Sequence, residues 1–557
     1  MKKIVIDPVT RIEGHLRVEV EVDEGGVVRE AYASGGLFRG IEIILKNRDP
    51  RDAGLLAGRI CGVCTNSHFR AAVSSVEDAY GIELPKNAQI IRDLIAMALF
   101  IQDHVVHFYH LHSLDFVDVT SALQADAALA LEEAKKYAKN PYASSLSHYE
   151  AVLLKLQNFV KAGRLGPFAY GYWGHSAYKL TPEQNLIIIS HYLEALKFQT
   201  ELSKAVAIFG GKTPHPQSIV VGGVTSVADM LNPQRLNDYI FSIKEAKEFV
   251  DNAYLSDMKL LAAAYRDEIK AGTGRGAGNF FSVGGYAFDA TQQLFSSGVV
   301  YGHDFSKVEE FDESKITEEV DRAWYSADGE VCYTDLNDDG TLKTAKSDDK
   351  YSWIKAPRYN GEAMECGPLA RVFVSYAKSN ELIKPFVDEF LKDTDLELTD
   401  LSSSVGRNAA RAIESAYICE YVFKLVSDLL QNIKHDDTQT WAKYEFEKLP
   451  HCAKGRAFFE VPRGVLSHFV SIKDQKIENY SVIAPTTWNA SPKDRFGKRG
   501  AYEQALIGIK IKDTAKPLEV LRVIHSFDPC LACAVHVIDA KGVELGNYKI
   551  KSVSCMV

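Results

Sequence analysis

The fold is decided by two cysteine motifs, Arg59-Ile60-Cys61-Gly62-Val63-Cys64-Thr65-Asn66-Ser67-His68 and Asp528-Pro529-Cys530-Leu531-Ala532-Cys533-Ala534-Val535-His536. They lie near opposite ends of the chain. In each, two residues separate the cysteines, a spacing that lets both thiolates reach one metal from a single turn. Four thiolates with nearby histidines suit a soft or borderline transition metal. We therefore expect the two motifs to form one site.

A structural zinc site with four cysteines is the main alternative. A single C-x-x-C pair also occurs in redox dithiols and zinc knuckles, so it identifies no function by itself. Zinc ribbons usually keep their two knuckles close in sequence, whereas most of this chain lies between Cys64 and Cys530. Joining both ends of a chain at a metal suits a buried reaction centre better than a structural staple.

Composition indicates an ordinary globular protein without a nucleic-acid partner. Hydrophobic residues make up 46% and charged residues 25% of the 557 residues, which are usual globular values. The formal net charge of −10 argues against nucleic-acid binding, because phosphate contacts need a basic surface. Nine cysteines in so long a chain do not make a disulfide framework. We expect those outside the motifs to be buried or incidental thiols: Cys332, Cys366, Cys419, Cys452 and Cys555.

The sequence predicts neither a membrane-spanning helix nor a signal peptide. Apolar segments such as residues 185–207 are interrupted by His, Glu and Lys, which disfavours a membrane span. Lys2 and Lys3 are followed by Asp7 before the apolar core of a signal peptide could form. On these features alone we expect a cytoplasmic protein.

The two motifs resemble those of the large, catalytic subunit of nickel–iron hydrogenases. The terminal run Arg522-Val523-Ile524-His525-Ser526-Phe527-Asp528 resembles the respiratory, hydrogen-uptake branch of that family most. The resemblance implies a hydrogenase, an oxidoreductase that acts on H2 as donor. It extends through most of the chain, in Arg11-Ile12-Glu13-Gly14-His15, Phe38-Arg39-Gly40-Ile41-Glu42, Gly210-Gly211-Lys212-Thr213-Pro214-His215-Pro216-Gln217, Lys355-Ala356-Pro357-Arg358-Tyr359, Val461-Pro462-Arg463-Gly464 and Thr486-Thr487-Trp488-Asn489.

Periodicity and the resemblance together predict an α+β fold that is predominantly α. Leu16 to Val22 alternates apolar and charged residues, which indicates a strand that pairs with a second one near Val27 to Ala33. Helical patterns and start signals predict long helices at Asn87 to Leu111, after Thr181-Pro182-Glu183-Gln184, from Asn232-Pro233 to Gly272, and from Ser403 or Ser404 to Ile433. We expect a long central helix bundle with small peripheral β-sheets, and N- and C-terminal segments that meet at a buried metal site.

We expect one large catalytic-subunit domain over residues 1–557. Its expected parts are an N-terminal hairpin with the first motif (1–75), a helix-rich core (76–272 and 376–435), a loop and strand elaboration (282–350), the second motif region (455–536) and a cleavable C-terminal tail (537–557).

The resemblance implies a nickel–iron centre. Cys61 and Cys530 would be terminal nickel ligands, and Cys64 and Cys533 would bridge nickel to iron. The iron would carry one carbon monoxide and two cyanide ligands. Metal binding deprotonates such thiols.

The resemblance also implies a magnesium ion near the C-terminal end. Its ligands would be Glu42, the main-chain carbonyl of Val482, and His536. Without the resemblance, Glu42 would be a helix-face carboxylate paired with Lys46 at i+4.

Four residues have implied roles in the reaction. Glu13 would pass protons to and from the site, taking them from Cys530; a carboxylate suits this because its surroundings shift its proton affinity appreciably. Asp103 and Arg463 would satisfy each other's charge above the metals. A solvated loop carboxylate and a surface arginine are the alternatives for Glu13 and Arg463. Residues expected around the ligands are His68, as a hydrogen-bond donor to a bridging sulfur, and Pro462, Thr486 and Asp528.

A tail follows His536, where mature large subunits of this family end. Residues 537–557 begin Val537-Ile538-Asp539, as removable tails in the family do. The resemblance implies cleavage between His536 and Val537 by a maturation endopeptidase after nickel insertion.

Electrons from H2 must leave through a partner, because the other cysteines lack iron–sulfur spacing. The resemblance implies an iron–sulfur small subunit in an obligate heterodimer, and a membrane cytochrome b reached through it. It also implies co-export to the periplasmic face of the cytoplasmic membrane, with a cytoplasmic location as the alternative. A hydrogen sensor and a non-enzymatic, zinc-stapled subunit are the alternative functions. Sensors generally lack a cleavable tail, so residues 537–557 count against the first.

Overall fold

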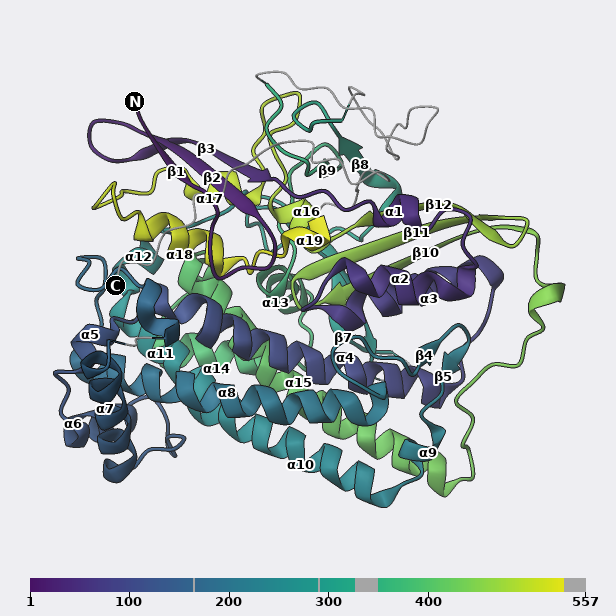
Figure 1. Ribbon diagram of the computed structural model, residues 1–557, viewed down its shortest axis with the longest axis horizontal. Coiled ribbons are helices and arrows are strands. Elements are labelled where there is room, and N and C mark those ends of the chain that lie inside the picture. Colours follow the sequence, from purple (N-terminus) through teal and green to yellow (C-terminus); the bar gives the residue numbers. More distant parts are fainter. Residues whose placement is uncertain (164–165, 289–290, 326–348, 535–557) are drawn as a thin grey trace.

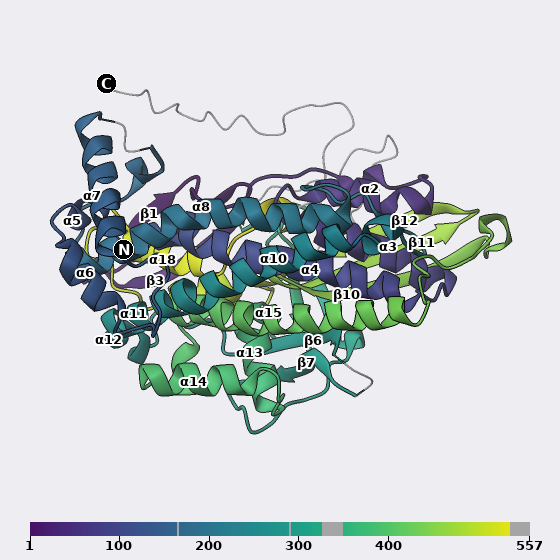
Figure 2. The ribbon, with the colours of Figure 1, turned by 90° about the horizontal axis from the view of Figure 1, so that it is seen from below.

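Four long helices lie side by side through the middle of the protein in the computed structural model (Figures 1 and 2). They are α4 (Lys86–Val106), α8 (Pro182–Gly210), α10 (Pro233–Phe249) and α15 (Ser404–Lys434). Helix α4 packs between α8 and α15, and α10 packs against both α8 and α15. The predicted helix bundle is therefore confirmed.

The structure describes residues 1–163, 166–288, 291–325 and 349–534. Several expectations lie wholly or partly outside these ranges: His536 as a ligand, the processing site and tail at 537–557, the thiols Cys332 and Cys555, and residues 289–290 and 326–348 of the predicted loop and strand elaboration.

The starts of the long helices follow their sequence signals. The Thr181 hydroxyl accepts a hydrogen bond from the backbone N–H of Gln184, and the Gln184 side chain accepts one from the backbone N–H of Thr181, which completes the predicted capping box of α8. Ser403 accepts from the N–H of Gly406 and caps α15. Helix α8 ends at Gly211 in the left-handed region, as the predicted stop signal requires.

Two predicted helices are interrupted by π-helical turns. Helix α4 ends at Val106 and continues as a π turn at His107–His112. The helix expected from Asn232 to Gly272 is divided into α10, a π turn at Val250–Tyr254, α11 (Leu255–Ala264) and α12 (Arg266–Lys270). The two π turns are tied to neighbouring helices by hydroxyl groups: Tyr254 donates to the His104 carbonyl and Tyr109 to Asp257. Apolar spacing does not encode such turns.

The strands form small antiparallel sheets around the bundle, as predicted. In the N-terminal sheet the predicted hairpin gains a third strand, because residues 2–6 pair with residues 18–22. The three-stranded sheets are β1 (Lys2–Ile6), β2 (Leu16–Val22), β3 (Val28–Gly35), and β10 (Cys452–Val461), β11 (Gly464–Lys473), β12 (Lys476–Ile483). The two-stranded ones are β4 (Ile219–Val220) with β5 (Gly223–Val224), β6 (Phe280–Ala287) with β7 (Gln293–Val300), and β8 (Ile316–Glu319) with β9 (Ala356–Tyr359).

Shorter helices surround the bundle. Helix α3 packs against β10 and β11, and α5, α6 and α7 gather at one end of the bundle (Figure 1). The shorter helices are α1 (Ile41–Ile44), α2 (Ala53–Ala57), α3 (Thr65–Tyr80), α5 (Val119–Ala122), α6 (Ala127–Ala134), α7 (Leu146–Lys161), α9 (Val227–Met230), α13 (Pro368–Ala377), α14 (Lys384–Thr394), α16 (Pro485–Asn489), α17 (Ala501–Leu506), α18 (Leu518–Ser526) and α19 (Leu531–Ala534).

Helix α19 lies where two hydrophobic cores meet. The larger core fills the bundle and includes Cys530 and Cys533. The second core joins the N-terminal sheet to α17 and α18, and includes Leu531 and Ala534. Within this short helix Cys533 therefore faces one core while Leu531 and Ala534 face the other, and the second motif is held from both sides.

One stretch of the described residues, Lys86–Asp115, is long and apolar enough to cross a membrane by length and composition. The sequence predicts a helix at Asn87 to Leu111 within this stretch, but no membrane span. In the structure 83% of its most apolar window is buried inside the protein, so packing within the bundle accounts for its apolar composition.

Candidate metal centre

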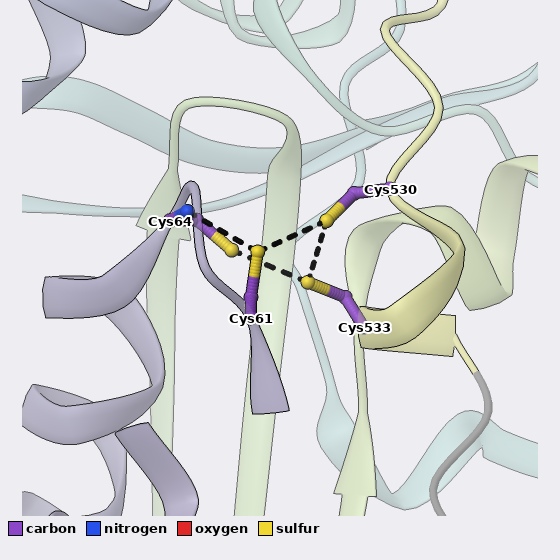
Figure 3. Close-up of side chains that lie close together, drawn as sticks. All are labelled: Cys61, Cys64, Cys530 and Cys533. Atoms are coloured by element: carbon purple, nitrogen blue, oxygen red, sulfur yellow. Dashed lines mark hydrogen bonds between the residues drawn. The ribbon is translucent and has the colours of Figure 1, made fainter. Parts of the chain in front are cut away.

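The four motif cysteines converge in the interior, as predicted (Figure 3). Their sulfur atoms all lie within 4.8 Å of one another, and all four residues are buried. Sγ of Cys61 is 3.4 Å from Sγ of Cys530, and Sγ of Cys64 is 3.2 Å from Sγ of Cys533. Each cysteine of the first motif thus faces the cysteine in the same position of the second.

Local backbone geometry aims the first pair. A 3-10 turn at Gly58–Ile60 precedes Cys61, and Cys64 is the N-cap residue of α3. The backbone N–H groups of Val63 and Cys64 both donate to Cys61 Sγ at 3.2 Å. These donors and the N-terminus of a sixteen-residue helix favour negative charge at this position.

Hydrogen bonding among the four thiols favours ionisation of one of them, Cys61. Hydrogen bonds from Cys530 and Cys533 hold the pKa of Cys61 well below its usual value. Burial raises the pKa of Cys530. Four buried, closely spaced sulfurs that cannot all ionise alone are suited to a thiophilic cation, which would deprotonate them. The donor set therefore fits a soft or borderline metal.

Glu13 lies directly against the second motif. Its backbone N–H donates to the Pro529 carbonyl at 3.2 Å, and its own carbonyl accepts from the N–H of Leu531 at 2.9 Å. Its Oε2 accepts from the N–H of Ala532 at 2.9 Å and from Cys530 Sγ at 3.3 Å. The predicted partnership of Glu13 with Cys530 is thus present as a direct contact.

The Glu13 carboxyl is poised to hold a proton. Burial is the main reason that its pKa is raised, and charge on Cys61 adds to the effect, whereas the N–H of Ala532 opposes it. A carboxyl group with raised pKa in contact with a thiol is placed to exchange a proton with it.

Gly14 permits this close approach. Its φ is +80°, and a Cβ there would lie 2.8 Å from both Leu531 Cβ and Ala532 N. Only glycine meets both conditions without displacing the second motif.

Arg463 is held between two carboxylates. It occupies the tip of the β10–β11 hairpin, with Nη1 at 3.2 Å from Asp103 Oδ2 and Nη2 at 3.0 Å from Asp528 Oδ1. All three residues are buried. Burial lowers the pKa of Arg463, but Asp528 and Asp103 more than offset it and raise it well above its usual value. The predicted pairing with Asp103 is present, and Asp528 is a second partner.

The pKa of Asp103 reflects the free-energy cost of burying its charge. Burial raises its pKa to about 7, against the opposing effect of Arg463. Among the described residues, Arg463 Nε and Asp528 Oδ2 are buried without a hydrogen-bond partner. Buried orphan polar atoms beside the sulfurs are consistent with a further group at this site.

Pro462 and Thr486 each accept a hydrogen bond that holds a segment of the site in place. The Pro462 carbonyl accepts from Nη2 of Arg371 at 3.0 Å, which anchors the hairpin that carries Arg463. The Thr486 hydroxyl accepts from the backbone N–H of Cys530 at 3.1 Å, so α16 fixes the second motif.

His68 begins a buried hydrogen-bonded chain. Its Nδ1 is 3.0 Å from Nε2 of His468, whose Nδ1 is 2.7 Å from the Tyr480 hydroxyl. Burial lowers the pKa of His68 to about 4, so its imidazole is neutral. The hydrogen bond from His68 to a bridging sulfur stays a prediction.

Glu42 is buried beside β12. Its Oε1 accepts from the backbone N–H of Val482 at 2.8 Å. Burial raises its pKa, and Lys355 opposes this more strongly than Lys46 does, so Lys46 is not its main cationic neighbour. The magnesium ligand set stays a prediction, because His536 lies outside the described residues.

The remaining described cysteines are unlike the motif cysteines. Cys366 and Cys419 are buried, and burial raises the pKa of both. Cys452 is exposed. Cys332 and Cys555 lie outside the described residues.

One buried cluster near the site is not predicted from the sequence. Asp115 lies between Arg11 and His525, which were quoted in motifs without a role. Asp115 carries no signal in the sequence, since a single aspartate after an apolar helix is more often a solvated cap.

Comparison with known proteins agrees with the site. The family model described as nickel-dependent hydrogenase matches residues 39–536, and one described as HoxL-like matches residues 3–34. The chain is 47% identical to the quinone-reactive Ni/Fe-hydrogenase large chain of Wolinella succinogenes, over 99% of each chain. It is 43% identical to the uptake hydrogenase large subunit of Rhizobium leguminosarum bv. viciae, over 99% of this chain and 98% of that one.

Solved structures share the fold. The as-isolated, oxidised Ni-Fe-Se hydrogenase of D. vulgaris Hildenborough superposes with a TM-score of 0.79 at 34% identity, covering 96% of this chain and 100% of that one. The selenium in that name belongs to that protein; this chain has cysteine at all four motif positions.

Proposed function

The chain belongs to the nickel-dependent hydrogenases, as the catalytic large subunit of a nickel–iron enzyme, and we propose that it oxidises H2 in an uptake reaction. The observation that carries the proposal is the cluster of four buried cysteine sulfurs with the Glu13 carboxylate in contact with Cys530. Relatives named uptake hydrogenases, 43% identical over 99% of this chain in one case, support the direction of the reaction.

The cysteines divide into two roles. Cys61 and Cys530 would be terminal nickel ligands, and Cys64 and Cys533 would bridge nickel and iron, with one carbon monoxide and two cyanides on the iron. The two contacts between the motifs support this division, since they join Cys61 to Cys530 and Cys64 to Cys533; within the second motif, Sγ of Cys530 also lies 2.7 Å from Sγ of Cys533. When bound, the centre would supply the electron acceptor needed to split H2, a very weak acid, heterolytically at neutral pH.

Protons leave through the chain's own groups. The Cys530 thiolate receives a proton and passes it to Glu13 Oε2, 3.3 Å away. The N–H of Ala532 holds that oxygen in place. Each H2 yields two protons and two electrons, so this transfer must operate twice in each turnover.

Arg463 is held in a fixed orientation beside the site. Its ion pairs with Asp103 and Asp528 fix the guanidinium and keep a positive charge near the thiolates, where it stabilises negative charge.

A small subunit with iron–sulfur clusters would take the electrons, because the described cysteines outside the motifs are dispersed and two of them are buried singly. The relatives' names, large chain and large subunit, support such a partner. The name of the quinone-reactive relative supports onward transfer of electrons towards a quinone, and we propose that a membrane cytochrome b is reached through the small subunit. As the resemblance implies, we propose that the complex lies on the periplasmic face of the cytoplasmic membrane, with a cytoplasmic location as the alternative.

Two further features complete the proposal. Glu42, the Val482 carbonyl and His536 would bind magnesium. An endopeptidase would cleave between His536 and Val537 to remove residues 537–557 after nickel insertion.

Infrared spectroscopy of the purified complex tests the proposal. We expect one carbon monoxide band, two cyanide bands and one nickel per large subunit, together with H2-dependent reduction of an artificial acceptor. Stoichiometric zinc without these bands in a tail-cleaved preparation would overturn it and favour a zinc-stapled subunit.

A further inference from the structure

A buried carboxylate braces the two chain segments that form the proton-transfer contact. Asp115 ends a 3-10 turn at Ser113–Asp115 and is fully buried. Its Oδ1 lies 2.5 Å from Nη2 of Arg11, and its Oδ2 lies 2.5 Å from Nδ1 of His525. Arg11 is two residues before Glu13, and His525 is five residues before Cys530. One carboxylate therefore joins the segment that carries the base to the segment that carries the thiol.

The histidine closes the brace. Its second nitrogen, Nε2, lies 2.8 Å from the carbonyl oxygen of Thr10. A carbonyl can only accept, so Nε2 donates to it, while Nδ1 donates to the Asp115 carboxylate. His525 thus links α18 to the backbone just before Arg11 as well as to Asp115.

Arg11 needs such support. Its φ is +56°, a left-handed conformation that is unfavourable for a non-glycine residue. Besides Asp115, its guanidinium donates to the carbonyl of Leu111 at 2.7 Å. These two bonds fix the loop that leads into Glu13.

The same two segments are joined again at the site. There the Glu13 backbone bonds to Pro529 and Leu531, and its carboxylate accepts from Ala532 and Cys530. The contact at the site and the brace at Asp115 are thus two ends of one structural unit. Burial raises the pKa of Asp115, but Arg11 and His525 outweigh it and hold that pKa below its usual value.

We propose that Asp115 is a positioning residue, which through Arg11 and His525 holds the Glu13 carboxylate in register with Cys530. The proposal rests on the proton-transfer role given to Glu13 above. Asp115 itself touches neither the cysteines nor Glu13 in any recorded contact among the described residues; it acts through the backbone on both sides.

The test is a double-mutant cycle on the purified holoenzyme complex. Glu13→Gln, Asp115→Asn and the double variant are compared with the unaltered enzyme in H2 oxidation with an artificial acceptor. Asp395→Asn is the matched control, because Asp395 forms an Arg–Asp pair with Arg266 at the exposed surface. Nickel and iron content and the infrared bands show whether the metal site is intact.

We expect Glu13→Gln to slow oxidation by roughly a hundredfold to ten-thousandfold, and Asp115→Asn by about tenfold to a hundredfold, as for a small misplacement of a reacting group. The double variant should be no slower than Glu13→Gln within about twofold, because both changes act on one step. Metal content and infrared bands should be unchanged. A merely structural residue would lower metal content or multiply the Glu13→Gln defect.

Three results would count against the inference. If Glu13→Gln slows the enzyme but Asp115→Asn does not, or if the two defects multiply, Asp115 does not act through Glu13. If Glu13→Gln has no effect, the proton-transfer role fails first and the inference fails with it. Should Asp115→Asn lose its metals, Arg11→Lys, which keeps the charge, is judged by the same criterion.

Discussion

Replacing Gly14 with alanine should show whether H2 oxidation depends on the contact between Glu13 and the second motif rather than on general backbone strain. At φ +80°, Gly14 is in a conformation that costs an L-residue about 1–2 kcal/mol. Its new Cβ would also lie 2.8 Å from Leu531 Cβ and Ala532 N, where ordinary contacts begin at 3.4 Å. The chain segment that carries Glu13 must therefore move away from α19.

The magnitude follows from that displacement. Relief of the overlap requires a shift of about half an ångström, and misplacement on the ångström scale costs about a hundredfold in rate. The N–H of Ala532 is 2.9 Å from Glu13 Oε2 and Cys530 Sγ is 3.3 Å from it, so both hydrogen bonds lengthen. We expect H2 oxidation to fall by about tenfold to a hundredfold.

Gly81→Ala is the matched control. Gly81 also has a left-handed φ, +63°, but no atom lies within 4 Å of the position of its Cβ. This variant should lose about 1 kcal/mol of stability and keep its activity. Both variants are assayed as purified complexes for H2 oxidation, metal content and melting temperature.

One outcome would refute the reasoning. If Gly14→Ala retains full activity with an intact metal site, the close packing of Gly14 on α19 does not set the position of Glu13. Equal losses of activity in both variants would mean that left-handed strain, rather than the contact, is responsible.

Three further predictions follow from other parts of the structure. Arg463→Lys should lower H2 oxidation about tenfold to a hundredfold, because one ammonium group cannot reproduce the forked guanidinium that joins Asp103 and Asp528. The control is Arg266→Lys at the surface pair with Asp395, which should be neutral. A fully active Arg463→Lys enzyme would contradict the role of the guanidinium. Burial raises the pKa of Glu503 to about 7 from 4.5, so its contribution to stability is complete below about pH 4.5 and is lost as the pH rises through 7, an effect of about 3 kcal/mol. Glu503→Gln, whose amide oxygen can still accept from the N–H of Ala33 and the Tyr351 hydroxyl, should therefore show a smaller fall in melting temperature between pH 5 and pH 8 than the unaltered protein; an equal fall would mean that another group titrates. Tyr480→Phe removes the hydroxyl that bonds to His468 and should destabilise the protein by about 1–3 kcal/mol, measured as a lower melting temperature with unchanged metal content, and an unchanged melting temperature would argue against this buried bond.

The sequence by itself determined the chemistry of the centre and the kind of fold. The two C-x-x-C motifs identified the donor atoms, because metal-binding spacing within one turn is a local property. Helix caps at Thr181 and Ser403 were equally readable, since each depends on residues within one turn. The family match and the helical fold with small sheets confirmed these expectations.

Only the tertiary structure decided which groups surround that centre. Asp528 as the second partner of Arg463, the Glu13 bond to Ala532, and the brace at Asp115 join residues separated by 65 to 519 positions. No local pattern encodes such contacts, because only the folded chain brings these distant segments together around α19, where two hydrophobic cores meet. The π turns at His107 and Val250 escaped prediction for the same reason: interhelical packing, rather than local propensity, fixes where a long helix is interrupted.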